Sequence, residues 1–394
     1  MRVLMISDVY FPRVNGVSTS IQTFRRALSA QGHESSLIAP AYPQPFDDEP
    51  GIHRIGSRYL PFDPEDRVMK ARAIRRLGDR LAGERYDLVH IQTPFVAHYL
   101  GVDLADRLGL PRVETYHTFF EEYLFHYIAF LPKAWLRAAA RRFSRAQSRA
   151  VDALIVPSTA MRERLAEYGV TTPMHVLPTG IPLTDFRGGD GAGFRRERGI
   201  PPGRPLMLFV GRVAFEKNIG FLIRALERAL RAVPDLLLVI AGEGPASGPL
   251  KKEVARRHLQ EHVLFVGYLD RRAALLDCYR AADAFVFASR TETQGLVLLE
   301  AMALGLPVIS TAVMGTRDIV GPGRGALVPE DDEADFASAM VRFVRDPAVR
   351  ARLAAEAVDW AREWQADAMA ARLAQLYEAV AGARPAPAAA TAAA

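Results

Sequence analysis

Two cationic side chains, Arg212 and Lys217, lie on one predicted loop in the second half of the chain. The loop begins at Gly211, directly after an apolar strand, and leads into a helix for which Asn218 is a plausible N-cap. A glycine at a strand end lets a ligand approach the backbone closely. An Arg can make a forked contact with phosphate oxygens, and a Lys can supply a point charge at a helix N-terminus. The pattern indicates a diphosphate site; the alternative is a solvated loop whose cations bind nothing.

A second loop carries carboxylates that could bind sugar hydroxyls. The predicted strand 284–288 ends in a polar segment that contains Glu292, and Glu300 lies inside the apolar helix that follows, where an unpaired carboxylate would be costly. If both lay on the helix, they would be about 12 Å apart along its axis. One could then reach a sugar ring and the other a ribose, since carboxylates accept hydrogen bonds from vicinal hydroxyls. The amides near Gln294 and Gly295, at the helix N-terminus, would help to hold the diphosphate between them. The alternative is structural, with Glu292 as a capping charge and Glu300 as a buried ion-pair partner.

The first half of the chain offers two candidates. Gly16 lies just before a predicted helix, on the loop after the first strand, and could also be an ordinary turn glycine. That loop lacks Gly-x-Gly-x-x-Gly, which disfavours a dinucleotide-binding dehydrogenase. His117 ends a predicted strand and would face the ligand edge of a sheet; the alternative is a packed histidine. The other histidines have no metal-ligand spacing and no Asp-x-Asp motif occurs, so no metal site is predicted.

The elements that must position these residues alternate between short apolar runs and longer helical patterns. Such runs suit central strands of parallel sheets that are covered by helices on both faces. The alternation predicts an α/β fold with doubly wound, Rossmann-like sheets that bind ligands at the carboxyl ends of their strands. The predicted strands are 3–7, 36–39, 88–92, 112–117, 153–157 and 175–178, and then 206–210, 236–241, 263–268, 284–288, 307–311 and 325–328.

The region richest in Gly and Pro, residues 181–203, separates the two sets of strands and is predicted to be a linker. Residues 1–180 would form an N-terminal domain and residues 204–360 a C-terminal domain, with a deep cleft between them. A helix at about 361–382 could pack back on the first domain. The tail, residues 385–394, has nothing to bury and is predicted to be disordered.

Composition excludes several classes of protein. The 394 residues, with 49% apolar and 24% charged content, are typical of a globular protein of two or three domains. The net charge of +5 is too small for a typical nucleic-acid-binding protein. The one cysteine, Cys278, excludes an intrachain disulfide, fits a reducing compartment and is predicted to be buried. No signal-peptide core or membrane span is evident, so we expect a cytoplasmic protein, soluble or peripheral on the inner face of the cell membrane.

The two loops of the second half resemble the signature of the family 4 (group 1) retaining glycosyltransferases, which have GT-B architecture. The resemblance lies in Gly211-Arg212 with Glu216-Lys217, followed by Glu292 and Glu300 with seven residues between them. Supporting matches are Gly242-Glu243-Gly244-Pro245, Phe265-Val266-Gly267-Tyr268 and the segment from Glu300 to Val308. The resemblance spans nearly the whole chain apart from the tail. It implies an acceptor-side N-terminal domain and a nucleotide-sugar-binding C-terminal domain.

The resemblance also implies roles for matching positions. Arg212 and Lys217 would neutralise the leaving diphosphate, Glu300 would bind the donor ribose, and Glu292 would contact sugar hydroxyls. The other positions would line the donor site: Gly16 and Gly211 near the phosphates, Gln294 and Gly295 at the diphosphate, Tyr268 and Leu269 near the base, and His117 against the sugar or the transition state. The enzyme would need no metal, and no cofactor besides its nucleotide-sugar co-substrate. The leaving phosphate would help to deprotonate the acceptor in an internal-return substitution.

The segment 117–127 resembles the acceptor-side motif of the diacylglycerol glucosyltransferases in this family. It departs from that motif in that Phe120 replaces a Tyr, Glu122 replaces an Asp, and the spacing to His126 is one residue longer. This resemblance implies a membrane-lipid acceptor such as diacylglycerol, and it favours UDP-glucose over GDP-mannose as the donor. The alternatives are a soluble or polysaccharide acceptor and, outside the class, a non-catalytic nucleotide-binding protein.

A basic amphipathic helix is predicted between residues 132 and 149. Its apolar side chains fall within about 100° of arc; they are Trp135, Leu136, Ala139, Phe143 and Ala146. Basic residues occupy the rest, with no acidic residue among them: Lys133, Arg137, Arg141, Arg142, Arg145 and Arg149. Such a helix suits an anionic membrane surface. The alternative is a surface helix whose apolar stripe packs on the domain core.

Overall fold

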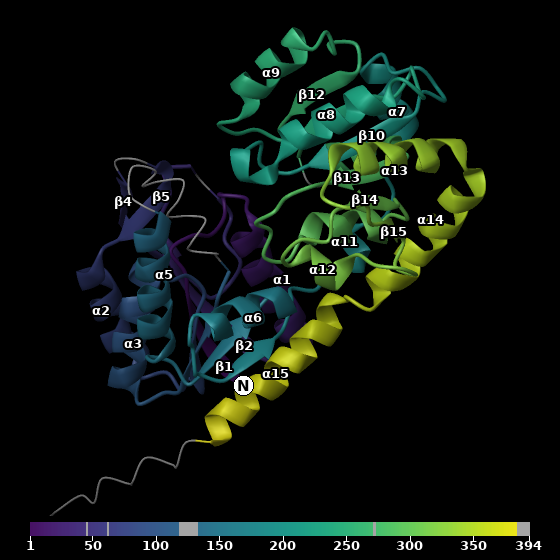
Figure 1. Ribbon diagram of the computed structural model, residues 1–394. Coiled ribbons are helices and arrows are strands. Elements are labelled where there is room, and N and C mark those ends of the chain that lie inside the picture. The colour runs from purple at the N-terminus through teal and green to yellow at the C-terminus, as the bar shows by residue number, and fades with distance from the viewer. Residues whose placement is uncertain (45, 61–62, 118–132, 271–272, 384–394) are drawn as a thin grey trace, which may run out of the picture. The chain divides into compact units, whose positions relative to one another are not determined.

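The computed structural model describes the chain except residues 45, 61–62, 118–132, 271–272 and 384–394. The chain divides into two compact units, and many of their elements are labelled in Figure 1. The first comprises Met1–Gly180 and the chain from Ala366, and the second comprises Ile181–Gln365. Each unit has its own parallel sheet and its own hydrophobic core.

The first unit is built on a seven-stranded parallel sheet in the order β3-β2-β1-β6-β7-β8-β9. The strands are β1 (Arg2–Ile6), β2 (Glu34–Pro40), β3 (Ile52–Ile55), β6 (Leu88–Ile91), β7 (Arg112–Thr115), β8 (Ala153–Val156) and β9 (Met174–Val176). An antiparallel hairpin is formed by β4 (Ser57–Leu60) and β5 (Asp63–Met69). The strand order reverses between β1 and β6, and this kind of switch point is where open α/β sheets bind ligands.

The described helices of the first unit include one from the far end of the chain. They are α1 (Gly16–Ala30), α2 (Ala71–Leu81), α3 (Val96–Leu108), α5 (Lys133–Ser148), α6 (Thr159–Glu167) and α15 (Ala366–Gly382). Helix α15 buries Met369, Leu373 and Tyr377 in the core that also holds Val3 and Met5 of β1. Their spacing of four residues places the three on one face of the helix, which explains why α15 packs on this unit.

The second unit has a six-stranded parallel sheet in the order β12-β11-β10-β13-β14-β15. The strands are β10 (Leu206–Val210), β11 (Leu237–Ala241), β12 (Val263–Gly267), β13 (Ala284–Phe287), β14 (Val308–Ser310) and β15 (Ala326–Leu327). The helices are α7 (Gly191–Glu197), α8 (Ile219–Ala229), α9 (Ser247–Arg256), α10 (Ala274–Ala281), α11 (Leu296–Ala303), α12 (Thr316–Ile319), α13 (Glu333–Arg345) and α14 (Pro347–Arg362), with short 3-10 turns η1 (Leu183–Asp185) and η2 (Phe215–Lys217). Cys278 of α10 is fully buried, and burial raises the pKa of its thiol to about 12.

The predicted α/β fold with two doubly wound sheets is confirmed, and every strand predicted from an apolar run lies within two residues of an observed one. The strands β3, β4 and β5 were not predicted. Their sequences, Ile-His-Arg-Ile in β3 and Asp-Pro-Glu-Asp-Arg-Val-Met in β5, are too polar to stand out as apolar runs.

The predicted linker, residues 181–203, is instead part of the second unit. Ile181, Phe194 and Ile200 are buried in its core, and α7 packs against α10. A side chain at Gly191 would collide with the backbone at Arg280. The glycines of this segment therefore permit close packing, a use of Gly that sequence composition cannot distinguish from flexibility.

Candidate active site

The loops that carry the predicted donor-site residues leave one edge of the second sheet. Strand β10 lies between β11 and β13, and all three strands are parallel. The loop from Gly211 after β10 and the loop from Ala288 after β13 therefore begin at neighbouring carboxyl ends. This topology brings together residues that are widely separated in the sequence.

Lys217 and Glu292 form an ion pair at this edge. Nζ of Lys217 lies 2.6 Å from Oε2 of Glu292, and the two side chains are 22% and 19% exposed. Limited exposure weakens solvent screening, so the pair is stronger than a fully exposed one. A cation and a carboxylate therefore lie side by side at this edge of the sheet.

Two further hydrogen bonds tie the loops together. The side-chain amide of Asn218 donates from Nδ2 to the carbonyl of Ala288 at 3.2 Å, and the hydroxyl of Ser289 donates to the carbonyl of Glu216 at 3.3 Å. Asn218 holds the N-cap position of α8, but its side chain makes no capping bond, which corrects the predicted role. Its backbone is left-handed, with φ of 55°, a conformation that Asn tolerates better than most residues.

Arg212 is exposed on the loop after β10, and the glycine-rich loop after β11 is hydrogen-bonded to that loop. The amide of Val213 donates to the carbonyl of Glu243 at 2.9 Å, and the amide of Ala246 donates to the carbonyl of Val213 at 2.9 Å. A side chain at Gly244 would collide with that carbonyl of Val213. The Gly-Glu-Gly-Pro motif thus lets one loop brace the other.

Glu300 is 3% exposed on α11, and its Oε2 accepts a hydrogen bond of 3.1 Å from the hydroxyl of Tyr279. Glu292 lies in the loop before Gly295, which is the N-cap of α11 and has φ of 100°. The separation of about 12 Å estimated for two residues on one helix therefore does not apply. Glu292 is not a first-turn charge of α11 either, because its partner is Lys217. The side chain of Gln294 is buried beside this N-terminus.

The two residues directly after β12 differ in exposure. Tyr268 is 58% exposed, whereas Leu269 is 9% exposed and belongs to the core of the second unit. Of the two residues predicted to lie near the base, only Tyr268 offers a side chain for stacking on a ligand.

The first unit places its two candidates at the carboxyl ends of β1 and β7. Gly16 is the first residue of α1, whose N-cap Asn15 accepts a hydrogen bond from the amide of Ser18 at 2.8 Å, and a Cβ at Gly16 would meet nothing within 4 Å. His117 follows β7, and its Nε2 lies 3.2 Å from Oε1 of Gln92. Burial lowers the pKa of His117 to about 4, so its imidazole is neutral at physiological pH.

Gln92, the partner of His117, was missed in the sequence. A signal was present, because His90 and Gln92 alternate with apolar residues in the otherwise apolar run from Leu88. Polar residues with a period of two lie on one face of a strand and indicate a polar cluster there. Tyr279, the partner of Glu300, carried no such signal.

Comparisons with known proteins identify the family. A family model described as "Glycosyl transferases group 1" matches residues 192–360, and "Glycosyltransferase Family 4" matches residues 14–185. The alpha-monoglucosyldiacylglycerol synthase of Streptococcus pneumoniae is 33% identical over 320 residues, which cover 79% of this chain and 71% of the relative. The chain belongs to glycosyltransferase family 4.

A second relative supports this assignment, and a solved structure shares the fold. The GDP-mannose-dependent alpha-mannosyltransferase of Mycolicibacterium smegmatis is 32% identical over 396 residues, covering 98% of this glycosyltransferase and 99% of the relative. The solved structure of sucrose-phosphate synthase from Thermosynechococcus elongatus has a TM-score of 0.77 and 23% identity, covering 97% and 100% of the two chains. This likeness confirms the predicted GT-B fold.

Helix α5 of the glycosyltransferase buries a different face from the predicted one. Trp135 is 72% exposed, and Ala139 and Ala146 are exposed, whereas Leu136 and Ala140 are buried. Ser144 and Gln147 are also buried. Both side chains are polar and both are hydrogen-bonded. The hydroxyl of Ser144 lies 2.8 Å from the hydroxyl of Tyr116, and the side-chain amide of Gln147 donates to the carbonyl of Pro94 at 2.5 Å. A projection that treats serine and glutamine as solvent-facing misses these contacts. Trp135 is thus exposed on the same helix as the exposed Arg137, Arg141, Arg142 and Arg145, and Arg149, which is also exposed, directly follows the helix.

The segment predicted to hold the acceptor motif lies outside the described residues beyond His117. No helix in the described part of the chain combines the length and hydrophobicity needed to cross a membrane. Among the same residues, no group of three or more His, Cys, Asp and Glu side chains is arranged to hold a metal ion.

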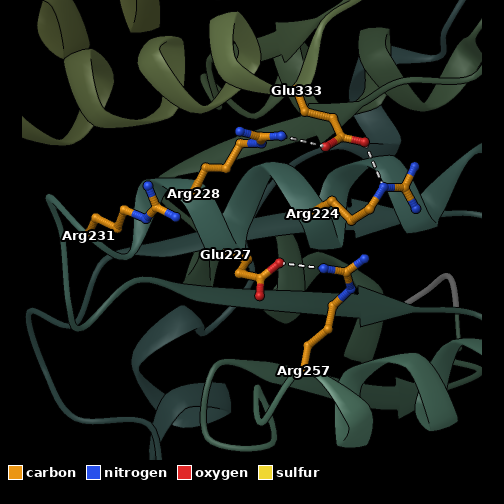
Figure 2. A pocket seen from close by; sticks show the side chains of 6 residues that line it. All are labelled: Arg224, Glu227, Arg228, Arg231, Arg257 and Glu333. Atoms are coloured by element: carbon orange, nitrogen blue, oxygen red, sulfur yellow. Dashed lines mark hydrogen bonds and ion pairs between the residues drawn. The ribbon is translucent and has the colours of Figure 1, made fainter.

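A hollow of about 280 Å³ on the second unit is lined by charged residues away from the predicted site (Figure 2). They are Arg224, Glu227, Arg228, Arg231, Arg257 and Glu333. Nε of Arg224 lies 2.6 Å from Oε1 of Glu333, and Nη1 of Arg257 lies 2.6 Å from Oε2 of Glu227. Because carboxylates already engage these guanidinium groups, the hollow is an ion-pair network that links α8 to the end of α9 and the start of α13.

Proposed function

We propose that this glycosyltransferase moves a hexose from a nucleotide sugar to a membrane-lipid acceptor such as diacylglycerol, with retention of the anomeric configuration. The ion pair of Lys217 and Glu292 is the observation that carries the proposal. It joins, at one sheet edge, a cation suited to a leaving phosphate and a carboxylate suited to sugar hydroxyls. UDP-glucose is the preferred donor and GDP-mannose the competing one.

The proposed chemistry needs positioning and charge stabilisation more than proton transfer by the protein. Lys217 and Arg212 would stabilise the negative charge that develops on the departing diphosphate, and preorganised cations of this kind lower the barrier substantially. Glu292 would orient the sugar, and Glu300 would bind the ribose. The departing phosphate would itself accept the acceptor's proton, because the substitution takes place on the face that the phosphate leaves.

The two candidate residues of the first unit would contribute neutral contacts to a ligand. His117 is uncharged at physiological pH and so could accept a hydrogen bond from a sugar hydroxyl without attracting a proton. Gly16 is proposed to lie near a donor phosphate, where an absent side chain leaves space for the ligand.

Two observations support a lipid acceptor. The relative from Streptococcus pneumoniae is named for synthesis of a glucosyldiacylglycerol. Helix α5 exposes Trp135 as well as Arg141 and Arg142, and a helix that exposes an aromatic ring together with cations suits the interface of an anionic membrane. We therefore propose a protein that acts on the inner face of the cell membrane through this helix, to which Lys133 would add charge.

A donor panel tests the proposal. The full chain is incubated with UDP-glucose or GDP-mannose, with and without anionic phospholipid vesicles that contain diacylglycerol, and release of nucleoside diphosphate is measured. We expect that nucleoside diphosphate is released from UDP-glucose only when the vesicles are present. NMR of the product should show that the α-anomeric configuration of the donor is retained. An inverted product would contradict the proposed mechanism.

The same assay separates the alternatives. Transfer to soluble sugars without any vesicle effect, together with no sedimentation of the protein with anionic vesicles, would support a soluble or polysaccharide acceptor. Saturable binding of a nucleotide sugar without turnover, under all acceptor conditions, would support a non-catalytic nucleotide-binding protein.

A further inference from the structure

A chain of buried hydrogen bonds runs from the C-terminal helix to His117. The hydroxyl of Tyr377 lies 2.6 Å from Nδ1 of His90, and Nε2 of Gln92 lies 3.0 Å from the same Nδ1. Oε1 of Gln92 lies 3.2 Å from Nε2 of His117. At the other side of the His90 ring, Nε2 lies 2.7 Å from the hydroxyl of Thr115. His90, Gln92 and Tyr377 are each less than 5% exposed, so water does not compete for these bonds.

The fold brings these residues to one face of the first sheet. His90 and Gln92 lie two residues apart at the end of β6, and Thr115 and His117 lie two residues apart at the end of β7. The two strands are paired, with His90 opposite Val113, so all four side chains share a face. Helix α15 adds Tyr377 to that face, where its ring makes an edge contact with the His90 ring.

The directions of the hydrogen bonds follow from the buried hydroxyl of Tyr377. Burial raises the pKa of Tyr377 and lowers the pKa of His90 to about 3, so both side chains are neutral. Among the described residues, the Tyr377 hydroxyl has one acceptor within reach, Nδ1 of His90. Nδ1 must therefore be unprotonated, and the ring proton of His90 lies on Nε2 and is donated to Thr115.

The orientation of the Gln92 side-chain amide links the protonation of His90 to the protonation of His117. An unprotonated Nδ1 on His90 requires the NH2 group of Gln92 to face it, which turns the carbonyl oxygen of Gln92 toward His117. His117 must then donate from Nε2, and its Nδ1 carries the lone pair. In the reverse orientation of the Gln92 amide, His90 would be protonated on Nδ1 and the buried Tyr377 hydroxyl would lose its acceptor, an unfavourable state.

We propose that Tyr377, His90 and Gln92 are positioning residues that hold His117 in the tautomer protonated on Nε2, so that its Nδ1 accepts a hydrogen bond from a hydroxyl of the donor sugar. The assignment of a sugar hydroxyl as the ligand rests on the proposed function, whereas the assignment of the His117 tautomer does not. Within the described residues, Nδ1 of His117 has no protein partner, which leaves it available to a ligand.

The tautomer is measured by NMR on the full chain with 15N-labelled histidine, without substrate, and the His117 signals are assigned by their loss in a His117→Gln variant. The ring shifts of His117 should report protonation on Nε2. In Tyr377→Phe, the ring shifts of His117 should move toward the values expected for a mixture of the two tautomers. The change in these shifts should be larger in Gln92→Leu. Tyr86→Phe removes another buried hydroxyl of the same unit, hydrogen-bonded to Ser36, and should leave the shifts unchanged. Protonation of wild-type His117 on Nδ1, or unchanged shifts in Gln92→Leu, would overturn the assignment.

Transfer assays with deoxy sugar donors then test the role of Nδ1. The transfer rate of the wild type should be lower with the donor that lacks the contacted hydroxyl than with the parent sugar. In Gln92→Leu, the transfer rates with these two donors should differ little. Gln92→Glu keeps an oxygen acceptor for His117 and should restore part of the discrimination. Full discrimination in Gln92→Leu would overturn the proposed contact. A wild-type chain that transfers no sugar would contradict the proposed function and leave the tautomer result standing.

Discussion

Nζ of Lys217 and Oε2 of Glu292 lie 2.6 Å apart, although 75 residues separate them in the chain. Lys217 ends the turn after β10, and Glu292 lies in the loop after β13. These strands are neighbours in a parallel sheet, so their carboxyl ends meet. The pair is positioned by the topology of the sheet, and each side chain also limits where the other can point.

The first prediction concerns this pair. Lys217→Ala should lower the turnover number by about 100-fold or more, because loss of one preorganised charge at a developing negative charge has an effect of this size. The free energy of unfolding should fall by only about 1 kcal/mol, because the pair is partly exposed. Steady-state kinetics and urea unfolding measure the two quantities.

Lys252→Ala is the matched control, because Lys252 is an exposed lysine of the same unit on α9. It should change neither turnover nor stability. Wild-type turnover in Lys217→Ala would remove Lys217 from the proposed site, and equal losses in both variants would indicate a nonspecific charge effect.

The second prediction concerns Tyr279, which donates to the buried carboxylate of Glu300. Tyr279→Phe should raise the KM for the nucleotide sugar with little change in kcat, because the reorganised carboxylate would bind ribose less well without affecting the departing phosphate. Removal of a buried hydrogen-bond donor should also cost about 1–3 kcal/mol of stability. Tyr86→Phe removes a buried hydroxyl that is hydrogen-bonded to Ser36 in the other unit, and a comparable rise in KM there would mean that the effect does not arise at Glu300.

The sequence was most informative where a strand end carries a charged loop. Strand β10 was predicted at its observed bounds, because five consecutive buried residues form an unbroken apolar run. Since parallel strands end at a common edge, the predicted positions of Lys217 and Glu292 already implied proximity. Their direct ion pair was not predictable, because no spacing rule relates side chains on two separate loops.

The buried face of α5 and the contact of Tyr377 with His90 could not be predicted from the sequence, for a related reason. Ser144 and Gln147 are buried because distant residues provide partners, and a helical projection of one segment does not contain those partners. Tyr377 and His90 are 287 residues apart. A helix at about 361–382 was predicted to pack back on the first domain, but local patterns do not determine which of its residues meets His90.

The third prediction separates two adjacent residues of α5. Leu136→Ala should destabilise the first unit by about 2–5 kcal/mol, as expected for a buried leucine. Trp135→Ala should have little effect on stability, because the side chain is 72% exposed, but it should reduce sedimentation with anionic vesicles. Vesicle binding that is unchanged in both Trp135→Ala and an Arg141→Ala, Arg142→Ala double variant would contradict the proposed membrane surface.

The fourth prediction is a pH dependence of stability that arises from Glu333. A hydrogen bond from Arg224, opposed by partial burial, lowers the pKa of Glu333 below its ordinary value of 4.5. A carboxyl group with a lowered pKa in the folded state stabilises that state when it is ionised. Its contribution is complete above the ordinary value and is lost as the pH falls through the folded-state value.

Glu333→Gln should therefore unfold at a lower urea concentration than wild type at pH 7, and the difference should narrow as the pH is lowered below the ordinary carboxyl pKa of 4.5. Urea midpoints at a series of pH values measure this. Glu261→Gln is the control, since Glu261 is exposed in the same unit and its carboxylate makes no ion pair among the described residues. A difference between wild type and Glu333→Gln that stays constant across the whole pH range would show that the ionised carboxylate is not what stabilises the junction of α8 and α13.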